Sequence, residues 1–211
     1  MLPTLPRAIQ DELEQLAHAY GQPLVRTVDL ANSDLFDPLN RTDRYGEVCM
    51  VVRRPNGRLL TMTKTFYPRA VSRLPTGGIN HGEPILSALL RETLEETGLQ
   101  VELRRFLAAV AYHTRNAQAS PVFYTFAFLL DETGGTLGAL DEAERLEAFF
   151  EVEPGSLPEL ASRLEQVEDI YTTEINGRWR DWGYFRAAIH RVVWEALEGQ
   201  ARICTNPASG G

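Results

Sequence analysis

Residues Gly77 to Leu99 read G-G-I-N-H-G-E-P-I-L-S-A-L-L-R-E-T-L-E-E-T-G-L, and the rest of the chain is organised around them. The pattern predicts a tight glycine turn followed by a helix. We expect Gly98 to end that helix, because glycine takes the left-handed conformation of a C-cap without strain. Three carboxylates at i, i+3 and i+4 share one helix face: Glu92, Glu95 and Glu96. On roughly the opposite face, three leucines are expected to pack inward: Leu86, Leu90 and Leu94.

Three like charges on one helix face repel one another and destabilise the helix. A hard divalent cation would reverse the sign of that effect, because Mg²⁺ and Mn²⁺ prefer oxygen ligands. The alternative interpretation is a solvated charged face, which is the usual meaning of a charge run. Only the spacing of the whole stretch favours the metal site over that alternative.

The composition limits the functions open to the chain. It has 211 residues, a formal net charge of −8 and a sequence pI of about 5.1. An acidic chain is not expected to bind nucleic-acid backbones broadly, although local arginines can still bind small anions. Lys64 is the one lysine beside twenty arginines, which we interpret as a genome-composition bias.

The cysteines and the apolar runs bear on location. Cys49 and Cys204 lie far apart and match no metal spacing, which is typical of a reduced, cytoplasmic protein. The N-terminus has no long apolar core and carries early acids, so no signal peptide is expected. The longest apolar run, Pro121 to Leu130, is too short to span a membrane, and no membrane partner is predicted.

Hydrophobic periodicity predicts an α/β fold in which helices cover both faces of a mixed sheet. The polar stretch before residue 45 indicates that residues 1–44 form an N-terminal extension. Ser156 and Glu159 have capping-box spacing. The expected elements are helix 6–20, strand 24–30, a hairpin of strands 47–53 and 58–65, the glycine-turn-helix element, β-rich segment 100–111, polar loop 112–120, strand 122–130, a glycine turn at 134–138, acidic segment 141–147 running into a strand that ends near 152, helices 156–167 and 181–197, and a disordered tail, 199–211.

The spacing of the central stretch is similar to the Nudix box, G-x5-E-x7-R-E-U-x-E-E-x-G-U, where U is a bulky aliphatic residue. Gly77, Glu83 and the pair Arg91-Glu92 match it, as do two further pairs: Glu95-Glu96 and Gly98-Leu99. Thr93 departs from the aliphatic preference, although its methyl group can pack there. The resemblance implies a Nudix-type α/β/α sandwich over residues 45–198. It also implies a hydrolase, a pyrophosphatase that uses magnesium or manganese to cleave the diphosphate bond of a nucleoside diphosphate linked to another group (NDP-X).

The resemblance also implies roles for particular residues. Metal ligands would be three glutamates and a backbone carbonyl near the glycines: Glu92, Glu95, Glu96 and Gly77 (or Thr76). Arg91 would hold carboxylates in orientation. Glu83 would act from farther away. A further carboxylate is expected from the acidic segment 141–147, and Glu144 is our choice there. The predicted catalytic set is therefore Glu95, Arg91, Glu83 and Glu144.

Substrate contacts are predicted around the box. Arg69 and Arg73 precede the glycines and could meet phosphates, although exposed arginines are common. Tyr112 and His113 begin the expected polar loop and could line a pocket, while a plain hydrogen-bonding role suits His113 equally well. Trp179 could stack on a base.

Two other functions remain open at this stage. One is a non-catalytic sensor that binds a nucleotide-like metabolite. The other is a prenyl-diphosphate isomerase, which needs a histidine-rich metal site that four scattered histidines do not suggest. The predicted partner is a small-molecule nucleoside diphosphate derivative. The N-terminal extension is compatible with a homodimer, by analogy alone. The group X is not predicted.

Overall fold

Strand β2 (Arg44–Arg53) lies at the centre of the sheet in the computed structural model, which describes residues 5–30, 36–39, 41–114 and 123–204. Its alternate side chains enter two different cores. Val48, Met50 and Val52 lie in the core shared with helices α1 (Arg7–Tyr20) and α2 (Ile85–Thr97). Cys49 and Val51 lie in the core shared with helices α3 (Leu157–Glu165) and α4 (Trp179–Cys204). A strand buried on both faces is what the continuous apolar run V-C-M-V-V, residues 48–52, predicts.

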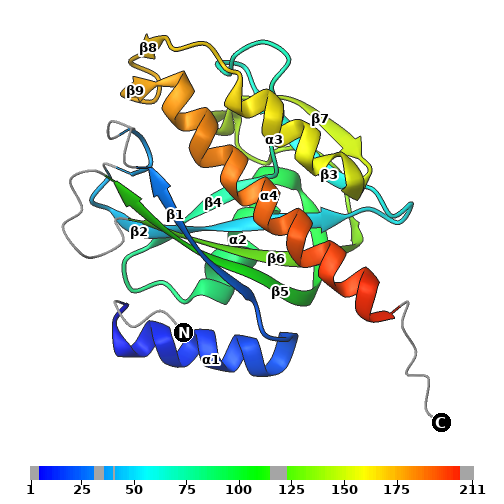
Figure 1. Ribbon diagram of the computed structural model, residues 1–211. Coiled ribbons are helices and arrows are strands. Elements are labelled where there is room, and N and C mark those ends of the chain that lie inside the picture. The colour runs from blue at the N-terminus through cyan, green and yellow to red at the C-terminus, as the bar shows by residue number, and fades with distance from the viewer. Residues whose placement is uncertain (1–4, 31–35, 40, 115–122, 205–211) are drawn as a thin grey trace.

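The described part of the chain forms a mixed seven-stranded sheet between two helical layers, which confirms the predicted α/β fold class (Figure 1). The strands follow the order β1-β5-β6-β2-β3-β7, and β4 pairs with β2. The β1–β5 and β2–β6 pairs are parallel, and the other pairs in this sheet are antiparallel. The remaining strands are β1 (Leu24–Leu30), β3 (Leu59–Lys64), β4 (Thr76–Asn80), β5 (Leu99–Thr114), β6 (Phe123–Gly135), β7 (Leu146–Val152), β8 (Tyr171–Thr172) and β9 (Gly177–Arg178).

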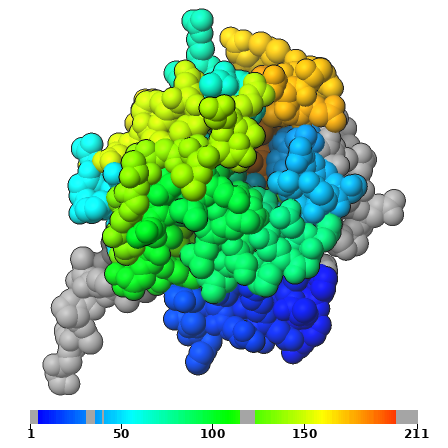
Figure 2. All heavy atoms as spheres, turned by 180° about the vertical axis from the view of Figure 1, so that it is seen from behind, coloured from blue at the N-terminus to red at the C-terminus, as the bar shows by residue number. Residues whose placement is uncertain are grey.

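The helices divide between the two faces of the sheet. Helices α3 (Leu157–Glu165) and α4 (Trp179–Cys204) cover one face, and α4 crosses the front of the sheet in Figure 1. Helices α1 and α2 cover the other face, where Figure 2 shows α1 in blue below the green segment that contains α2. Two short 3₁₀ turns, η1 (Glu142–Glu144) and η2 (Pro154–Ser156), flank β7. No helix in the described ranges is long and apolar enough to cross a bilayer.

The N-terminal helix and strand form as predicted, and both join the main body of the protein. Strand β1 pairs in parallel with β5, from Leu24 opposite Ala108 to Leu30 opposite Thr114. The Glu12 carboxylate on α1 accepts a hydrogen bond of 3.1 Å from the Leu86 amide at the start of α2. The domain boundary near residue 44 stays a prediction.

Two expectations about the central stretch are wrong. Gly77 and Gly78 do not form a turn, because they lie in strand β4 opposite Val48 and Glu47. Leu90 and Leu94 do not pack inward, since they are 45% and 46% exposed. The buried face of α2 instead carries Ile85, Ala88, Leu89, Thr93 and Glu96. The helix therefore turns the side that carries Glu96 toward the sheet, and the two leucines on roughly the opposite side face outward.

Other element ends differ from expectation. The polar loop expected from Tyr112 starts later, because β5 continues to Thr114; residues 115–120 of that loop lie outside the described residues. Ser156 makes no capping hydrogen bond, since η2 precedes α3 and gives Ser156 helical angles (φ −84°, ψ −9°). Helix α4 runs to Cys204 rather than ending before 199, and the rest of the expected tail, 205–211, lies outside the described residues.

Candidate active site

Strand β4 and helix α2 approach each other so closely that only glycine fits at the contact. A Cβ atom added to Gly77 would lie 2.2 Å from the Glu92 carboxyl carbon. A Cβ on Gly78 would lie 2.1 Å from the Arg44 guanidinium. The two glycines therefore serve close approach and not a turn. The Glu92 carboxylate is thereby brought against the backbone of β4.

Arg91 gathers three carboxylates of the central stretch. Its guanidinium binds Glu83 through two hydrogen bonds, both of 2.8 Å. It also donates to Glu92 at 2.8 Å and to Glu95 at 3.0 Å. A further bond of 3.1 Å reaches the Gly78 carbonyl on β4. This planar, multiply bonded arrangement supports the predicted orienting role of Arg91.

The carboxylates around Arg91 differ in burial, and their pKa values shift in opposite directions. The hydrogen bonds from Arg91 hold the pKa of Glu83 below its usual range. Burial raises the pKa of Glu92, and this outweighs the opposing hydrogen bond from Arg91. Glu95 is more open, with 45% of its side chain exposed. The site thus offers carboxylates of unequal proton affinity within one network.

A second network lies deeper and contains a residue that sequence reasoning dismissed. The Lys64 ammonium, at the end of β3, donates to Glu96 at 3.1 Å and to Glu144 at 2.7 Å. Glu96 is 2% exposed, and its Oε2 has no hydrogen-bond partner among the described residues. The predicted Glu144, on η1, is therefore brought to the same cluster as the central helix. The one signal for Lys64 in the sequence was its being the sole lysine.

Burial and the charge of Lys64 shift the pKa values of Glu96 and Glu144 in opposite directions. Burial raises the pKa of Glu96 to about 7, although the charges of Lys64 and Arg73 oppose the change. Burial alone would also raise the pKa of Glu144, but the hydrogen bond and charge of Lys64 hold it below the usual range. For Lys64 itself, burial lowers the pKa, and the charge of Glu96 with the hydrogen bond to Glu144 more than offsets this. The Lys64 ammonium therefore contacts two carboxyls whose pKa values shift in opposite directions, Glu144 downward and Glu96 upward.

The donor set suits a hard divalent cation, although the side chains are not already arranged around one. In the ranges that the structure describes, no three His, Cys, Asp or Glu side chains converge as a ready set of metal ligands. The reason is visible in the contacts, because Arg91 and Lys64 hold the carboxylates. Two features fit Mg²⁺ or Mn²⁺: the donors are all oxygens, and Glu96 Oε2 has no hydrogen-bond partner among the described residues.

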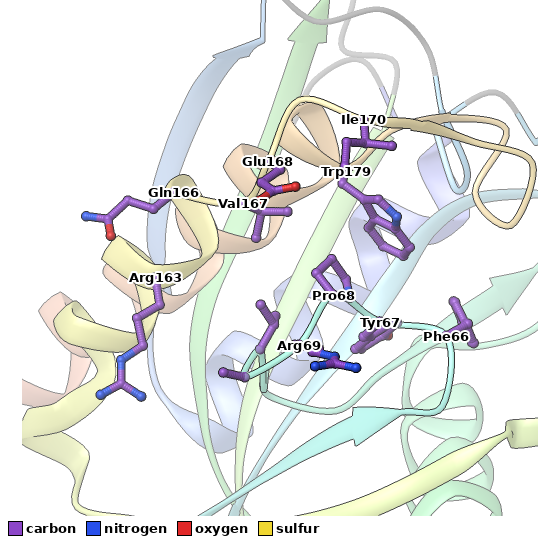
Figure 3. A pocket seen from close by; sticks show the side chains of 12 residues that line it. Phe66, Tyr67, Pro68, Arg69, Arg163, Gln166, Val167, Glu168, Ile170 and Trp179 are labelled. Carbon is purple, nitrogen blue, oxygen red and sulfur yellow. The ribbon is translucent and has the colours of Figure 1, made fainter.

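Of the two arginines predicted to meet phosphates, only one is open to solvent. Arg69 lines a cavity of about 640 Å³ together with Phe66, Tyr67 and Trp179 (Figure 3). In Figure 3 the Trp179 ring points toward the loop that carries Phe66, Tyr67 and Arg69. Arg73 is 3% exposed and is corrected to a structural cation. Its guanidinium is consumed inside the protein by Tyr67 Oη at 2.7 Å, the Leu74 carbonyl at 2.8 Å and Thr76 Oγ1 at 3.1 Å.

The predicted pocket residues Tyr112 and His113 are not brought to the carboxylates. Tyr112 is fully buried in the core, with its ring centroid 4.6 Å from that of Phe185. His113 lies in β5 opposite Asp29 of β1, and strands β6 and β2 separate β5 from the strand that carries Lys64. Side chains alternate between the two faces of a strand, and this alternation directs Tyr112 into the core. The sequence did not predict this burial, because Tyr112 was assigned to a loop.

Helix α4 fixes the strands beneath the site through buried polar contacts that the sequence did not reveal. Arg186 donates to the Glu47 carboxylate on β2 at 2.6 Å. The Leu74 amide, just before β4, donates to His190 Nε2 at 3.0 Å, and His190 Nδ1 contacts the Arg186 carbonyl at 2.7 Å. Burial lowers the pKa of His190 to about 4, so the neutral ring can accept the Leu74 bond.

Three comparisons with known proteins bear on the family of this chain. A family model described as the NUDIX domain matches residues 44–170. An ADP-ribose pyrophosphatase from Methanocaldococcus jannaschii is 31% identical over 127 residues, covering 60% of this chain and 72% of that protein. Nudix hydrolase 2 of Arabidopsis thaliana is 32% identical over 109 residues, covering 51% of this chain but only 39% of the plant protein. A crystal structure of a C. elegans Ap4A hydrolase binary complex is 12% identical, with a TM-score of 0.47, over 74% of this chain and 98% of that one.

The family model covers more than half of the chain, and its range contains both carboxylate networks. The archaeal relative is 31% identical to this chain, and the match covers 72% of the length of that relative. On these findings the chain belongs to the Nudix domain family and is a pyrophosphohydrolase.

Proposed function

We propose that this protein hydrolyses the diphosphate bond of an NDP-X compound with Mg²⁺ or Mn²⁺ bound at the carboxylates. The observation that carries the proposal is the convergence of two carboxylate networks, one around Arg91 and one around Lys64, at strand β4 and helix α2. Both networks balance acidic oxygens with cationic side chains. The archaeal relative is named for ADP-ribose, which is itself an NDP-X compound.

The roles of the residues follow from their contacts. Glu92, Glu95 and Glu96 would hold the metal, which supplies positive charge that offsets the repulsion between carboxylates and phosphate oxygens. Arg91 fixes the carboxylates in orientation, with Glu83 as its bidentate partner. A water oxygen attacks phosphorus, the bridging P–O bond breaks, and the water proton is taken by a carboxylate.

Glu144 is our choice for that proton acceptor. It is ionised near neutral pH because Lys64 holds its pKa low, and it lies on a short turn at the edge of the cluster. Glu142 occupies the same turn and is exposed, so it provides a matched control. Glu144→Gln is expected to reduce kcat by about 100-fold, the range typical of losing general-base catalysis. Glu142→Gln should leave kcat unchanged, and equal effects of the two substitutions would reject the assignment.

The aromatic cavity supports a place for the nucleoside half of the substrate. Phe66 and Tyr67 offer partly exposed rings on which a base can stack, and Trp179, which is 8% exposed, adds the edge of a third ring. Arg69 and Arg163 lie at the wall of the same cavity. Arg145 links the residues of this cavity to the carboxylate cluster. The Arg145 guanidinium lies 4.4 Å from the Phe66 ring centroid, and Arg145 directly follows Glu144. A substrate bound across both regions would present its diphosphate to the carboxylates.

A screen of NDP-X compounds with Mg²⁺, with Mn²⁺ and with a chelator tests the proposal. The expected result is metal-dependent release of two phosphorylated products, for ADP-ribose AMP and ribose 5-phosphate. Release without added metal, or none from any NDP-X compound, would reject it. The sensor alternative predicts binding without products, and the isomerase alternative predicts a rearranged prenyl diphosphate. The homodimer and the cytoplasmic location stay predictions, and light scattering of the purified chain tests the former.

A further inference from the structure

Lys64 is the one lysine of the chain, and it lies partly buried between two carboxylates of the site. Twenty arginines carry the remaining side-chain charge of this kind. The Lys64 side chain is 12% exposed and contacts Glu96, 32 residues later, and Glu144, 80 residues later. The pairing of β3 with β7 shifts register between Thr63 and Lys64. Such a bulge redirects the side chain at the end of a strand, often beside an active site.

Arg91 and Lys64 hold their carboxylate partners in different ways, and the difference decides which of them a metal ion can displace. Arg91 holds Glu83 through two parallel hydrogen bonds, a geometry that adds both energy and specificity to the ion pair. The Lys64 ammonium makes one contact to each carboxylate and sits on a flexible four-carbon stem. Within the part of the chain that the structure describes, one buried oxygen of Glu96 has no hydrogen-bond partner. A cation approaching that oxygen would therefore share Glu96 with Lys64 or replace it.

We propose that Lys64 is an internal cation that holds Glu96 and Glu144 together in the metal-free protein and yields carboxylate oxygens when a divalent cation binds. The proposal rests on the metal site of the proposed function. It makes Lys64 a positioning residue whose contacts compete with metal binding. It also gives a reason for a lysine here in a chain that otherwise uses arginine, because an arginine fork would resist displacement.

Removal of the ammonium should have two opposite effects. Without Lys64, the buried Glu96 has no ion-pair partner among the described residues, so the metal-free protein should lose stability. The same loss leaves the two carboxylates unbalanced, so a divalent cation should bind more tightly. By linkage, added metal should then stabilise the variant more than it stabilises the wild type.

Binding of Mn²⁺ to the full chain without substrate, followed by electron paramagnetic resonance, tests these effects. Lys64→Met is expected to lower the Mn²⁺ dissociation constant by about tenfold, the effect of one removed neighbouring charge at a partly screened site. Lys64→Arg keeps the charge and should bind no more tightly than wild type. The matched control is Arg53→Met, which removes a cation at the opposite end of the β2–β3 pair and should change the constant by less than about twofold.

The melting temperature supplies a second readout in the same variants. Mg²⁺ should raise it more for Lys64→Met than for wild type. A dissociation constant for Lys64→Met that is equal to or higher than the wild-type value would overturn the proposal. If wild-type protein binds no Mn²⁺ at all, the metal site of the proposed function fails as well, so the two failures are distinguishable.

The wild-type chain allows a test that needs no variant, in case Lys64→Met does not fold. Acetylation by an amine-reactive ester reports on Lys64 as the one lysine of the chain, and a lysine-containing peptide in the same reaction serves as the reference. Mg²⁺ is expected to raise the rate at Lys64 relative to the reference peptide by about threefold or more, because the ammonium leaves its carboxylate partners. An unchanged ratio at saturating Mg²⁺ would overturn the proposal.

Discussion

The buried carboxyl of Glu96 allows a quantitative prediction about stability. Burial raises its pKa from 4.5 to about 7. The native state therefore holds the proton more tightly than the unfolded chain does. The wild-type protein loses stability as the pH rises from about 4.5 through about 7, because a buried carboxyl must then ionise. That difference in proton affinity corresponds to about 3 kcal/mol, and the near-complete burial of Glu96 means that solvent screening reduces it little.

Glu96→Gln removes the ionisation and keeps the size of the side chain. The free energy of unfolding of the variant, minus that of wild type, should therefore grow by about 3 kcal/mol between about pH 5 and about pH 8. The amide also adds a constant offset, because it changes the hydrogen bonds to Lys64. The offset does not depend on Glu96 ionisation, so the change with pH isolates the carboxyl. The same variant should lose most metal-dependent turnover.

Urea unfolding in the presence of a chelator measures this difference at several pH values. Glu95→Gln is the matched control, because it removes a neighbouring carboxylate with 45% of its side chain exposed and little burial to relieve. A Glu96→Gln difference that stays constant within about 0.5 kcal/mol across the range would refute the reasoning. The same outcome would mean that Lys64 fully compensates the burial of Glu96.

Four further outcomes are expected. Gly77→Ala should retain its circular dichroism spectrum but lose about 100-fold in kcat, since the added Cβ displaces Glu92. Arg91→Met should lower the free energy of unfolding by about 1–3 kcal/mol in chelator, and added Mg²⁺ should restore part of the loss. Trp179→Ala should raise KM by about tenfold with kcat little changed in steady-state assays, if its ring stacks on the base. Leu94→Gln should cost less than about 1 kcal/mol in urea unfolding, because the side chain is 46% exposed.

Local sequence patterns predicted helices and strands well in segments whose apolar residues recur at one clear spacing. Helix α1, strand β1 and the β2–β3 hairpin follow from apolar spacing and the turn at residues 55–57. The parallel pairings of β1 with β5 and of β2 with β6 could not be read in this way. They join segments far apart in the chain, and no local period reports a distant partner.

The errors concern orientation and have a common physical cause. Leu90 and Leu94 were expected inside because a helix normally buries its apolar face. Here the buried face carries Glu96, whose cost is offset by Lys64 from another strand. Gly77 was read as a turn, although a strand can also need glycine for close approach. In each case a contact with a residue remote in sequence decided the outcome, and such contacts are densest at a functional site.

The parallel pairing of β1 with β5 also bears on how the chain folds during synthesis. Leu24 pairs with Ala108, which lies 84 residues later. At typical elongation rates of about 5–20 residues per second, β1 waits roughly 4–17 s for its partner strand to be made. Throughout that interval the amphipathic helix α1 and strand β1 lack the surface that buries them. A nascent chain stalled before residue 108 should therefore be the stage most prone to aggregation and to capture by chaperones.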